Sequence, residues 1–362
     1  MEGPVATWRL RCHSAFRTPH SAFAMQAIAW SPSGAVRILD QRALPGARIE
    51  RDLETAEEVA EAIRTLQVRG APLIGIAAAM GLVAGLRAHR TARRDAFLAR
   101  LIDLVCLLDA TRPTAVNLHW ALERMSRAAH EAPGDGDAIW TSLAAQAAAI
   151  WEDDRAMCRR IGEFGLPLIR DGTNVLTHCN AGALATGGIG TALAPIYLAH
   201  EAGRQVHVYV GETRPLLQGA RLTAWELTEA GVPCTIIADA AAAALLRGDH
   251  INVIVVGADR IAANGDFANK IGTYALAVLA FHHEVPFYCA APSSTIDSNI
   301  ATGEGIPIEC RSPEEVTMFA GRPIAPAAAA ALNPAFDVTP ARYVKGYITD
   351  RGIMHPPFKP EP

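Results

Sequence analysis

Two side chains that could take part in catalysis closely follow runs of β-branched or apolar residues. Cys179 follows the run 174–178, and Asp259 comes three residues after the apolar run 251–256. In an open parallel sheet, ligands bind outside the carboxyl ends of the strands, so both side chains are expected beside a ligand. A helix N-terminus at Cys179 would favour its thiolate, whereas most free cysteines are simply buried small apolar residues. Both interpretations of Cys179 stay open at this point.

Asp259 has two possible roles, as the N-cap of a helix or as a general acid or base in an apolar pocket. A free aspartate has a pKa of about 3.9, so donating a proton at pH 7 requires a rise that costs about 4 kcal/mol. Burial can raise the pKa of a carboxyl group that far. The acid role therefore requires that Asp259 is shielded from water and from nearby cations.

Cations and amides beside glycine or proline form a second group of candidates. They occur at 69–72, at 112–114 and at 269–270. Arginine binds phosphate through two parallel hydrogen bonds, and lysine binds it as a point charge. Taken singly, each is typically a surface charge. Because several stand near predicted element ends, together they indicate a phosphate site.

The glycine-rich stretch 182–190 does not match either nucleotide-binding motif. Gly188-Ile189 stands where a P-loop needs Lys-Ser/Thr, and Leu193 stands where the dinucleotide motif needs its third glycine. The stretch is interpreted as a helix start after a strand. Its N–H groups could hold a phosphate, or its glycines could serve only close packing of the helix on the sheet.

Metal and redox motifs are missing from the sequence. His282 and His283 are adjacent, no H-E-x-x-H or G-x-S-x-G motif occurs, and the seven cysteines include no C-x-x-C pair. An odd number of scattered cysteines is typical of free thiols in a reducing compartment. We therefore expect no metal site and a cytoplasmic location.

Length and composition limit the remaining possibilities. The chain has 362 residues, half of them hydrophobic, so two domains are expected. A net charge of −4 with mixed signs and 6% aromatic residues argue against nucleic-acid binding. The longest apolar run, 71–86, is shorter than the roughly 20 residues of a membrane-spanning helix. No membrane anchor is predicted.

Helical patterns dominate the first half of the chain. Residues 1–24 carry arginines and serines and are interpreted as a disordered leader, a transit peptide or an over-long start. A hairpin is predicted over 26–44. After Thr55 a period of 3.6 residues predicts helices, with further ones over 94–108, 117–132 and 138–163. Residues 25–167 are therefore predicted to be a mainly helical N-terminal domain with a small sheet. The last helix is long enough to bridge two domains.

Strands alternate with helices in the second half of the chain. The predicted strands cover 174–178, 206–211, 234–238, 251–256 and 287–291. Alternation with helical stretches predicts βαβ units. The fold class is therefore α/β, with 168–362 forming a Rossmann-like, doubly wound parallel sheet.

Nine segments, in order along the chain, resemble those of one family. They are 69–75, 112–118, 177–182, 211–215, 218–221, 257–260, 269–273, 291–294 and 333–337. They resemble the methylthioribose-1-phosphate isomerases of methionine salvage, within the superfamily of the initiation-factor-2B alpha, beta and delta subunits. The resemblance covers about residues 25–356.

The resemblance implies an aldose–ketose isomerase that converts 5-methylthioribose 1-phosphate to 5-methylthioribulose 1-phosphate as a homodimer, with no cofactor. It implies that Asp259 is the proton donor and that Cys179 stabilises the transition state. The residues implied in substrate binding are Arg69, Gly70, Ala71, Arg112, Gln218, Asn269 and Lys270.

Two alternatives stay open from the sequence. One is an isomerase of 5-deoxyribose 1-phosphate or ribose 1,5-bisphosphate, and a second phosphate would call for extra cations. The other is a non-catalytic regulatory subunit, against which Cys179 and Asp259 in their motifs argue. The sequence also leaves open whether hydrogen moves from C2 to C1 as a proton or as a hydride.

Overall fold

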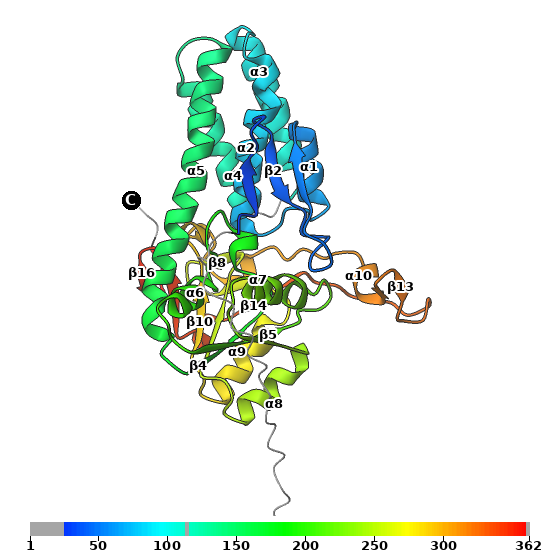
Figure 1. The fold of residues 1–362 in the computed structure, drawn as a ribbon, viewed down its shortest axis with the longest axis vertical. Helices are drawn as coiled ribbons and strands as arrows, with labels where there is room; N and C mark the ends of the chain where they lie inside the picture. The colour runs from blue at the N-terminus through cyan, green and yellow to red at the C-terminus, as the bar shows by residue number, and fades with distance from the viewer. Residues whose placement is uncertain (1–24, 113–115, 360–362) are drawn as a thin grey trace, which may run out of the picture.

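The computed structural model describes residues 25–112 and 116–359, so the predicted leader lies outside the described residues. Figure 1 shows an elongated molecule, with a helical bundle and a small sheet at one end and a larger sheet flanked by helices at the other. The α/β class predicted from the sequence is confirmed.

The N-terminal part combines a small sheet with five helices. Strands β1 (Ile28–Trp30), β2 (Val36–Leu39) and β3 (Glu50–Leu53) pair antiparallel, which confirms the predicted hairpin. The helices are α1 (Ala56–Arg64), α2 (Ala71–Leu86), α3 (Arg94–Asp109), α4 (Val116–Glu131) and α5 (Gly136–Gly165). At the start of α1, Thr55 and Glu58 form a capping box, in which each side chain accepts a hydrogen bond from the other residue's N–H.

Helix α2 is the centre of this bundle. The stretch Ala71–His89 is long and apolar enough to cross a membrane by length and composition alone. However, 72% of it is buried inside the fold, as in the core helix of a soluble protein. Its apolar side chains pack against α1, α3, α4 and α5, which explains why the helix is hydrophobic on all sides.

Helix α5 joins the two parts of the molecule. Leu143 and Ile150 pack in the core of the bundle, whereas Ile161, further along the same helix, packs in the core under the large sheet. Figure 1 shows α5 running along both parts. The helix that was predicted to be long enough to bridge two domains therefore does connect the bundle with the large sheet.

The large sheet has seven strands in the order β16-β15-β10-β7-β4-β5-β6. They are β4 (Thr173–Thr177), β5 (Val206–Gly211), β6 (Cys234–Ile237), β7 (Val253–Val256), β10 (Phe287–Ala290), β15 (Gly346–Thr349) and β16 (Gly352–Met354). All pairs are parallel except β15 with β16. The five predicted strands are confirmed, while β15 and β16 were not predicted. The strand order reverses between β4 and β7, which creates a switch point for ligand binding.

Helices cover both faces of this sheet. Helices α5, α6 (Ala194–Glu201) and α7 (Ala224–Glu229) cover one face, and α8 (Ala242–Arg247) and α9 (Thr273–His282) cover the other. Alternate strand residues enter opposite cores: Val175 lies on the first face and Leu176 on the second. This doubly wound arrangement is the one predicted.

A second, four-stranded sheet in the order β11-β8-β9-β14 was not predicted. Its strands are β8 (Arg260–Ala262), β9 (Phe267–Lys270), β11 (Ile296–Asp297) and β14 (Phe336–Thr339). Between β11 and β14, an arm made of α10 (Glu314–Thr317), β12 (Met318–Phe319) and β13 (Arg322–Pro323) projects from the body (Figure 1). The small sheet matters for the site because it carries Asn269 and Lys270.

Candidate active site

A cavity of about 140 Å³ lies at the carboxyl ends of β4 and β7. This is the switch point of the large sheet, where bound ligands are expected. The cavity is lined by all nine residues proposed from the sequence, namely Arg69, Gly70, Ala71, Arg112, Cys179, Gln218, Asp259, Asn269 and Lys270. The structure therefore brings together residues from the bundle, the large sheet and the small sheet.

Cys179 follows β4 and is held by its backbone. Its N–H donates to Thr213 Oγ1 at 2.8 Å, and its carbonyl accepts from Thr223 Oγ1 at 2.6 Å. The expected stabilisation by a helix N-terminus is wrong, because the next α-helix begins only at Ala194. Burial raises the pKa of the thiol above its ordinary value, although the Arg69 charge opposes this. Cys179 is therefore a neutral thiol rather than a thiolate.

Asp259 follows β7 and precedes strand β8, so the helix N-cap role is wrong. Its N–H donates to the Ala268 carbonyl at 2.9 Å across the small sheet. Burial raises the pKa of the carboxyl group above its ordinary value, and Lys270 and Arg112 are the main charges that oppose this rise. The expected shielding from cations is therefore not met, yet burial outweighs them and favours the protonated acid.

Two cations keep their charge free for a ligand. Arg69 donates from its two terminal nitrogens to the side-chain and backbone oxygens of Asn180, at 2.5 and 2.8 Å. Lys270 Nζ lies 4.2 Å from the centre of the Phe336 ring. Burial lowers the pKa of this lysine. Among the residues that the structure describes, neither Arg69 nor Lys270 forms an ion pair with a carboxylate.

Arg112 differs because its charge is already compensated. Its guanidinium donates to Glu309 Oε2 at 3.0 Å, and Glu309 in turn pairs with Arg311 at 3.2 Å. These residues come from the segment that leads to the projecting arm. Arg311 also pairs with Glu315 at 2.6 Å, so two arginines face two glutamates. The cavity therefore offers two free cations beside a network in which the charges are balanced.

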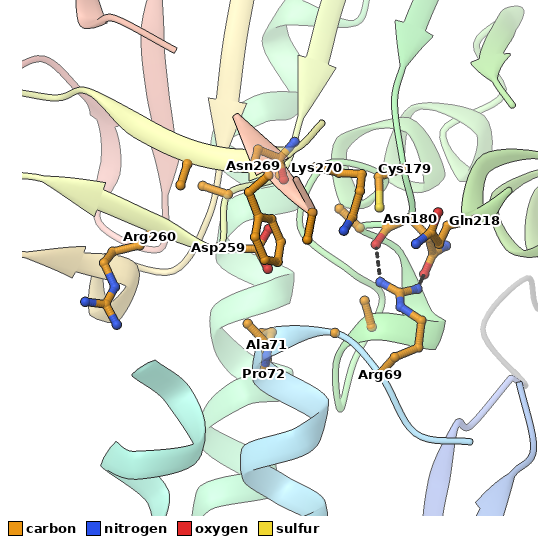
Figure 2. A pocket seen from close by; sticks show the side chains of 18 of the residues that line it. Arg69, Ala71, Pro72, Cys179, Asn180, Gln218, Asp259, Arg260, Asn269 and Lys270 are labelled. Atoms are coloured by element: carbon orange, nitrogen blue, oxygen red, sulfur yellow. Dashed lines mark hydrogen bonds between the residues drawn. The ribbon is translucent and has the colours of Figure 1, made fainter. Parts of the chain in front are cut away.

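Helix α2 begins at the cavity. Gly70 has φ +98°, and a Cβ placed there would stand 2.6 Å from the Cα of Ala185. The first N–H groups of a helix have no partner within the helix, and the helix dipole favours an anion there. Figure 2 shows Ala71 and Pro72 at this first turn, facing the cavity that Asp259 and Lys270 enter from the sheets.

Two amides complete the lining. Gln218 is buried, and in the described part of the chain its Oε1 has no hydrogen-bond partner. Since buried polar atoms are nearly always bonded, this oxygen is suited to a hydroxyl group of a ligand. Asn269 is held by a 3.0 Å hydrogen bond from its Nδ2 to Thr273 Oγ1.

The glycine-rich stretch 182–190 is not a helix start, which corrects the sequence interpretation. It forms only a 3-10 turn at Ala183–Ala185. Its N–H groups bond inside the protein: Gly187 donates to Asp154 Oδ2 at 2.6 Å and Gly190 donates to Thr186 Oγ1 at 3.1 Å. These N–H groups are therefore not available to a phosphate.

Sequence reasoning missed three residues that shape the site. Asn180 orients Arg69, and its position directly after Cys179 was the available signal. Phe336 lies against Lys270 because β14 pairs with β9, a contact that no local pattern reveals. Glu226, fully buried behind Asn180, is also separated from it by many residues. Within residues 25–112 and 116–359, no group of three metal-binding side chains occurs.

The chain is similar to known proteins over most of its length. The model of the Initiation factor 2 subunit family matches residues 67–356. A methylthioribose-1-phosphate isomerase of Gemmatimonas aurantiaca is 54% identical over 333 residues, which cover 92% of this chain and 94% of that protein.

Two crystal structures share the fold. The 5-methylthioribose 1-phosphate isomerase from Pyrococcus horikoshii has a TM-score of 0.88 at 43% identity, and covers 95% of this chain and 96% of its own. The translation initiation factor eIF-2B, subunit delta, from A. fulgidus has a TM-score of 0.84 at 39% identity, with coverages of 92% and 97%. By these similarities, the chain belongs to the Initiation factor 2 subunit family and, within it, to the methylthioribose-1-phosphate isomerases.

Proposed function

We propose that this chain converts 5-methylthioribose 1-phosphate to 5-methylthioribulose 1-phosphate in methionine salvage. Its relatives carry the name of this enzyme. The observation that carries the proposal is one cavity that holds an acid with a raised pKa, a neutral thiol and two cations that pair with no carboxylate in the described part of the chain. A non-catalytic regulatory subunit has no need of this combination.

The phosphate on the anomeric oxygen prevents the ring from opening in the simple way of a free sugar. In our proposal, Asp259 protonates the ring oxygen, the C1–O bond breaks, and C1 becomes electron-deficient. Hydrogen then moves from C2 to C1, and the C2 hydroxyl gives its proton to the Asp259 carboxylate to form the ketone. The raised pKa of Asp259 supports this role, because the acid must start protonated.

Cys179 is proposed to stabilise the transition state beside C1 and C2. Its thiol faces the same cavity, and burial raises its pKa, so it does not carry a full negative charge. A neutral, polarisable side chain lets the electron-deficient carbon form without being captured as a covalent adduct. Exclusion of water by the bound substrate would also favour hydride transfer over exchange with solvent.

The charges support a substrate with one phosphate group. Arg69, Lys270 and the first turn of α2 are proposed to bind it, with Gln218, Asn269 and Arg112 orienting the sugar. The other arginines that line the cavity are already paired: Arg311 with Glu315 at 2.6 Å and Arg260 with Asp297 at 3.5 Å. Ribose 1,5-bisphosphate would need further free cations. The apolar lining residues Leu66, Ile74, Leu216 and Ile306 suit a methylthio group instead.

We further propose that two copies associate in the cytoplasm, with no nucleic acid or membrane as partner. Phe319 and Ile324 on the projecting arm are 50% and 59% exposed, which suits contact with a second copy. The net charge of −4 disfavours a nucleic-acid partner. Light scattering of the purified protein tests the association, and a monomeric mass would contradict it.

The decisive experiment is proton NMR of the purified protein with 5-methylthioribose 1-phosphate in D2O. Ketose is expected, and its formation establishes the isomerase. Deuterium at C1 would indicate a base that exchanges with solvent, whereas retained protium favours hydride transfer. If the protein converted none of 5-methylthioribose 1-phosphate, 5-deoxyribose 1-phosphate and ribose 1,5-bisphosphate, the proposal that it is an isomerase would be wrong.

A further inference from the structure

Glu226 is a carboxyl group with no exposure to solvent, and the proposed chemistry does not use it. Its Oε1 accepts a hydrogen bond from Asn180 Nδ2 at 2.8 Å, and its Oε2 accepts one from the Leu184 N–H at 3.1 Å. Burial raises its pKa to about 7. A buried carboxyl group costs free energy unless its partners offset the loss of water, so its retention calls for an explanation.

The Asn180 amide stands between Glu226 and the cavity. Its Oδ1 accepts from Arg69, while its Nδ2 donates to Glu226 Oε1 and to Thr223 Oγ1. Figure 2 shows the hydrogen bonds from Arg69 to Asn180 beside Cys179. An amide can be turned over so that its oxygen and nitrogen exchange places, and its neighbours decide which way it points. Above its pKa of about 7, Glu226 is an ionised carboxylate that only accepts hydrogen bonds, so it turns the Asn180 NH2 group toward itself and the oxygen toward Arg69.

The surrounding chain makes room for this carboxyl group. A Cβ at Gly182 would overlap Glu226 Oε1. The loop that carries Leu184 therefore closes over Glu226 only because residue 182 is glycine. The arrangement is built into the fold rather than left to a mobile surface side chain.

We propose that Glu226 is a positioning residue, which acts through Asn180 to hold the Arg69 guanidinium where it binds the phosphate of the substrate. The chain of contacts runs from the buried carboxylate to the amide, and from the amide to the free cation. The role in isomerisation rests on the proposed function, whereas the effect on phosphate binding does not.

The substitution E226Q tests the orientation of the amide with little change in shape. One end of the new side chain carries NH2, and it faces either the Leu184 N–H or the Asn180 NH2. In the second case the Asn180 amide turns over and presents its NH2 to Arg69, where two donors repel each other. Arg69 then leaves its position, although the overall fold is kept.

The expected result is weaker binding of phosphate. The affinity for inorganic phosphate, measured by calorimetry, should fall about tenfold to a hundredfold, which is the range for a lost hydrogen bond to a charged group. The KM for the sugar phosphate should rise by a similar factor, with kcat changed less, because a phosphate contact is made equally in the ground and transition states.

A matched control separates positioning from general support of the loop. Asp154 is also a buried carboxyl group that binds this loop, through the Gly187 N–H, and among the described residues no hydrogen bond joins it to Asn180. D154N should therefore leave phosphate affinity within about twofold of wild type. Should E226Q fail to fold, N180A removes the same connection, and it should weaken phosphate binding in the same way.

A double-mutant cycle gives the decisive result. In R69K the two hydrogen bonds to Asn180 are not both made, so adding E226Q should weaken phosphate binding little further. If E226Q binds phosphate as wild type does, or if its effect multiplies fully with that of R69K, the proposal is wrong. If these effects appear in a protein that turns over no sugar phosphate, the proposed function fails and the positioning role stands.

Discussion

At the scale of single residues, burial in the site disfavours the charged forms of one acid and one thiol. Burial holds Asp259 toward its neutral acid and Cys179 toward its neutral thiol. Arg69 and Lys270 meanwhile stand without a carboxylate partner in the described part of the chain. In the proposed complex, a phosphate group therefore meets positive charge next to an acid whose pKa is raised, which is the combination that acid-assisted ring opening needs.

Replacing either central residue should stop the chemistry and spare binding. D259N cannot donate the proton, and C179S replaces a polarisable sulfur with a smaller hydroxyl. Turnover in the NMR assay is expected to fall by about two orders of magnitude or more for D259N, the usual range for a lost general acid, and markedly for C179S. Calorimetry should find phosphate affinity nearly unchanged. A variant that turns over within a few-fold of wild type would remove that residue from the mechanism.

The pH dependence follows from the same acid. Since Asp259 must start protonated, kcat/KM should fall as pH rises through its raised pKa.

Much of this scale was predictable from the sequence, because the key residues stand where strands and helices end. Cys179 and Asp259 follow recognisable strands, and Arg69 precedes a recognisable helix. The neutral state of Cys179 was not predictable, because it depends on burial and on where the next helix starts. Asn180, Phe336 and Glu226 act through contacts between distant segments, and no local spacing reveals these.

At the scale of elements, the start of α2 is tightly constrained. Gly70 combines a positive φ with close contact to the backbone of Ala185. The helix dipole and the first N–H groups point into the cavity from this position. The geometry of the proposed phosphate site therefore depends on one residue without a side chain.

Substituting Gly70 should weaken substrate binding more than it destabilises the large sheet. G70A forces the start of α2 away from Ala185, so the KM for the sugar phosphate is expected to rise about tenfold or more, as for other lost contacts to a charged group. The matched control is G172A, where φ is +77° but no atom lies within 4 Å of the added Cβ. It should cost about 1 kcal/mol of stability and leave KM unchanged. Equal KM values for the two variants would contradict the role of Gly70.

Helices and long strands were predictable at this scale, whereas the small sheet was not. The strands β8 and β11 have only three and two residues, too few to show an alternating pattern. β9 and β14 pair across a separation of more than sixty residues. That pairing is the reason why Lys270 lies against Phe336. Part of the site therefore depends on a small sheet that no local sequence pattern predicts.

At the scale of the whole molecule, buried acids link stability to pH. Burial raises the pKa of Asp154 to about 6, that of Glu226 to about 7 and that of Asp337 to about 6. At these three groups the folded protein therefore binds more protons than the unfolded chain between about pH 4 and about pH 7. Their contribution to stability is present at low pH and is lost as pH rises through these pKa values.

Removing one of these acids should flatten the pH profile. For D154N, the loss of unfolding free energy between about pH 5 and about pH 8 should be smaller than for wild type by about 1 to 2 kcal/mol. Urea denaturation at both pH values measures this difference. An unchanged slope would mean that Asp154 stays ionised throughout.

The walls of the cavity come from two different hydrophobic cores. Arg69, Gly70 and Ala71 belong to the bundle end, whereas Cys179 and Asp259 belong to the sheet end. The proposed phosphate contacts thus come from both ends, Arg69 from the bundle end and Lys270 from the small sheet, whereas the acid and the thiol both come from the sheet end. Substitutions confined to the bundle would therefore change how a phosphorylated sugar is held. Asp259 and Cys179 would keep their positions at the ends of their strands and act on the new substrate.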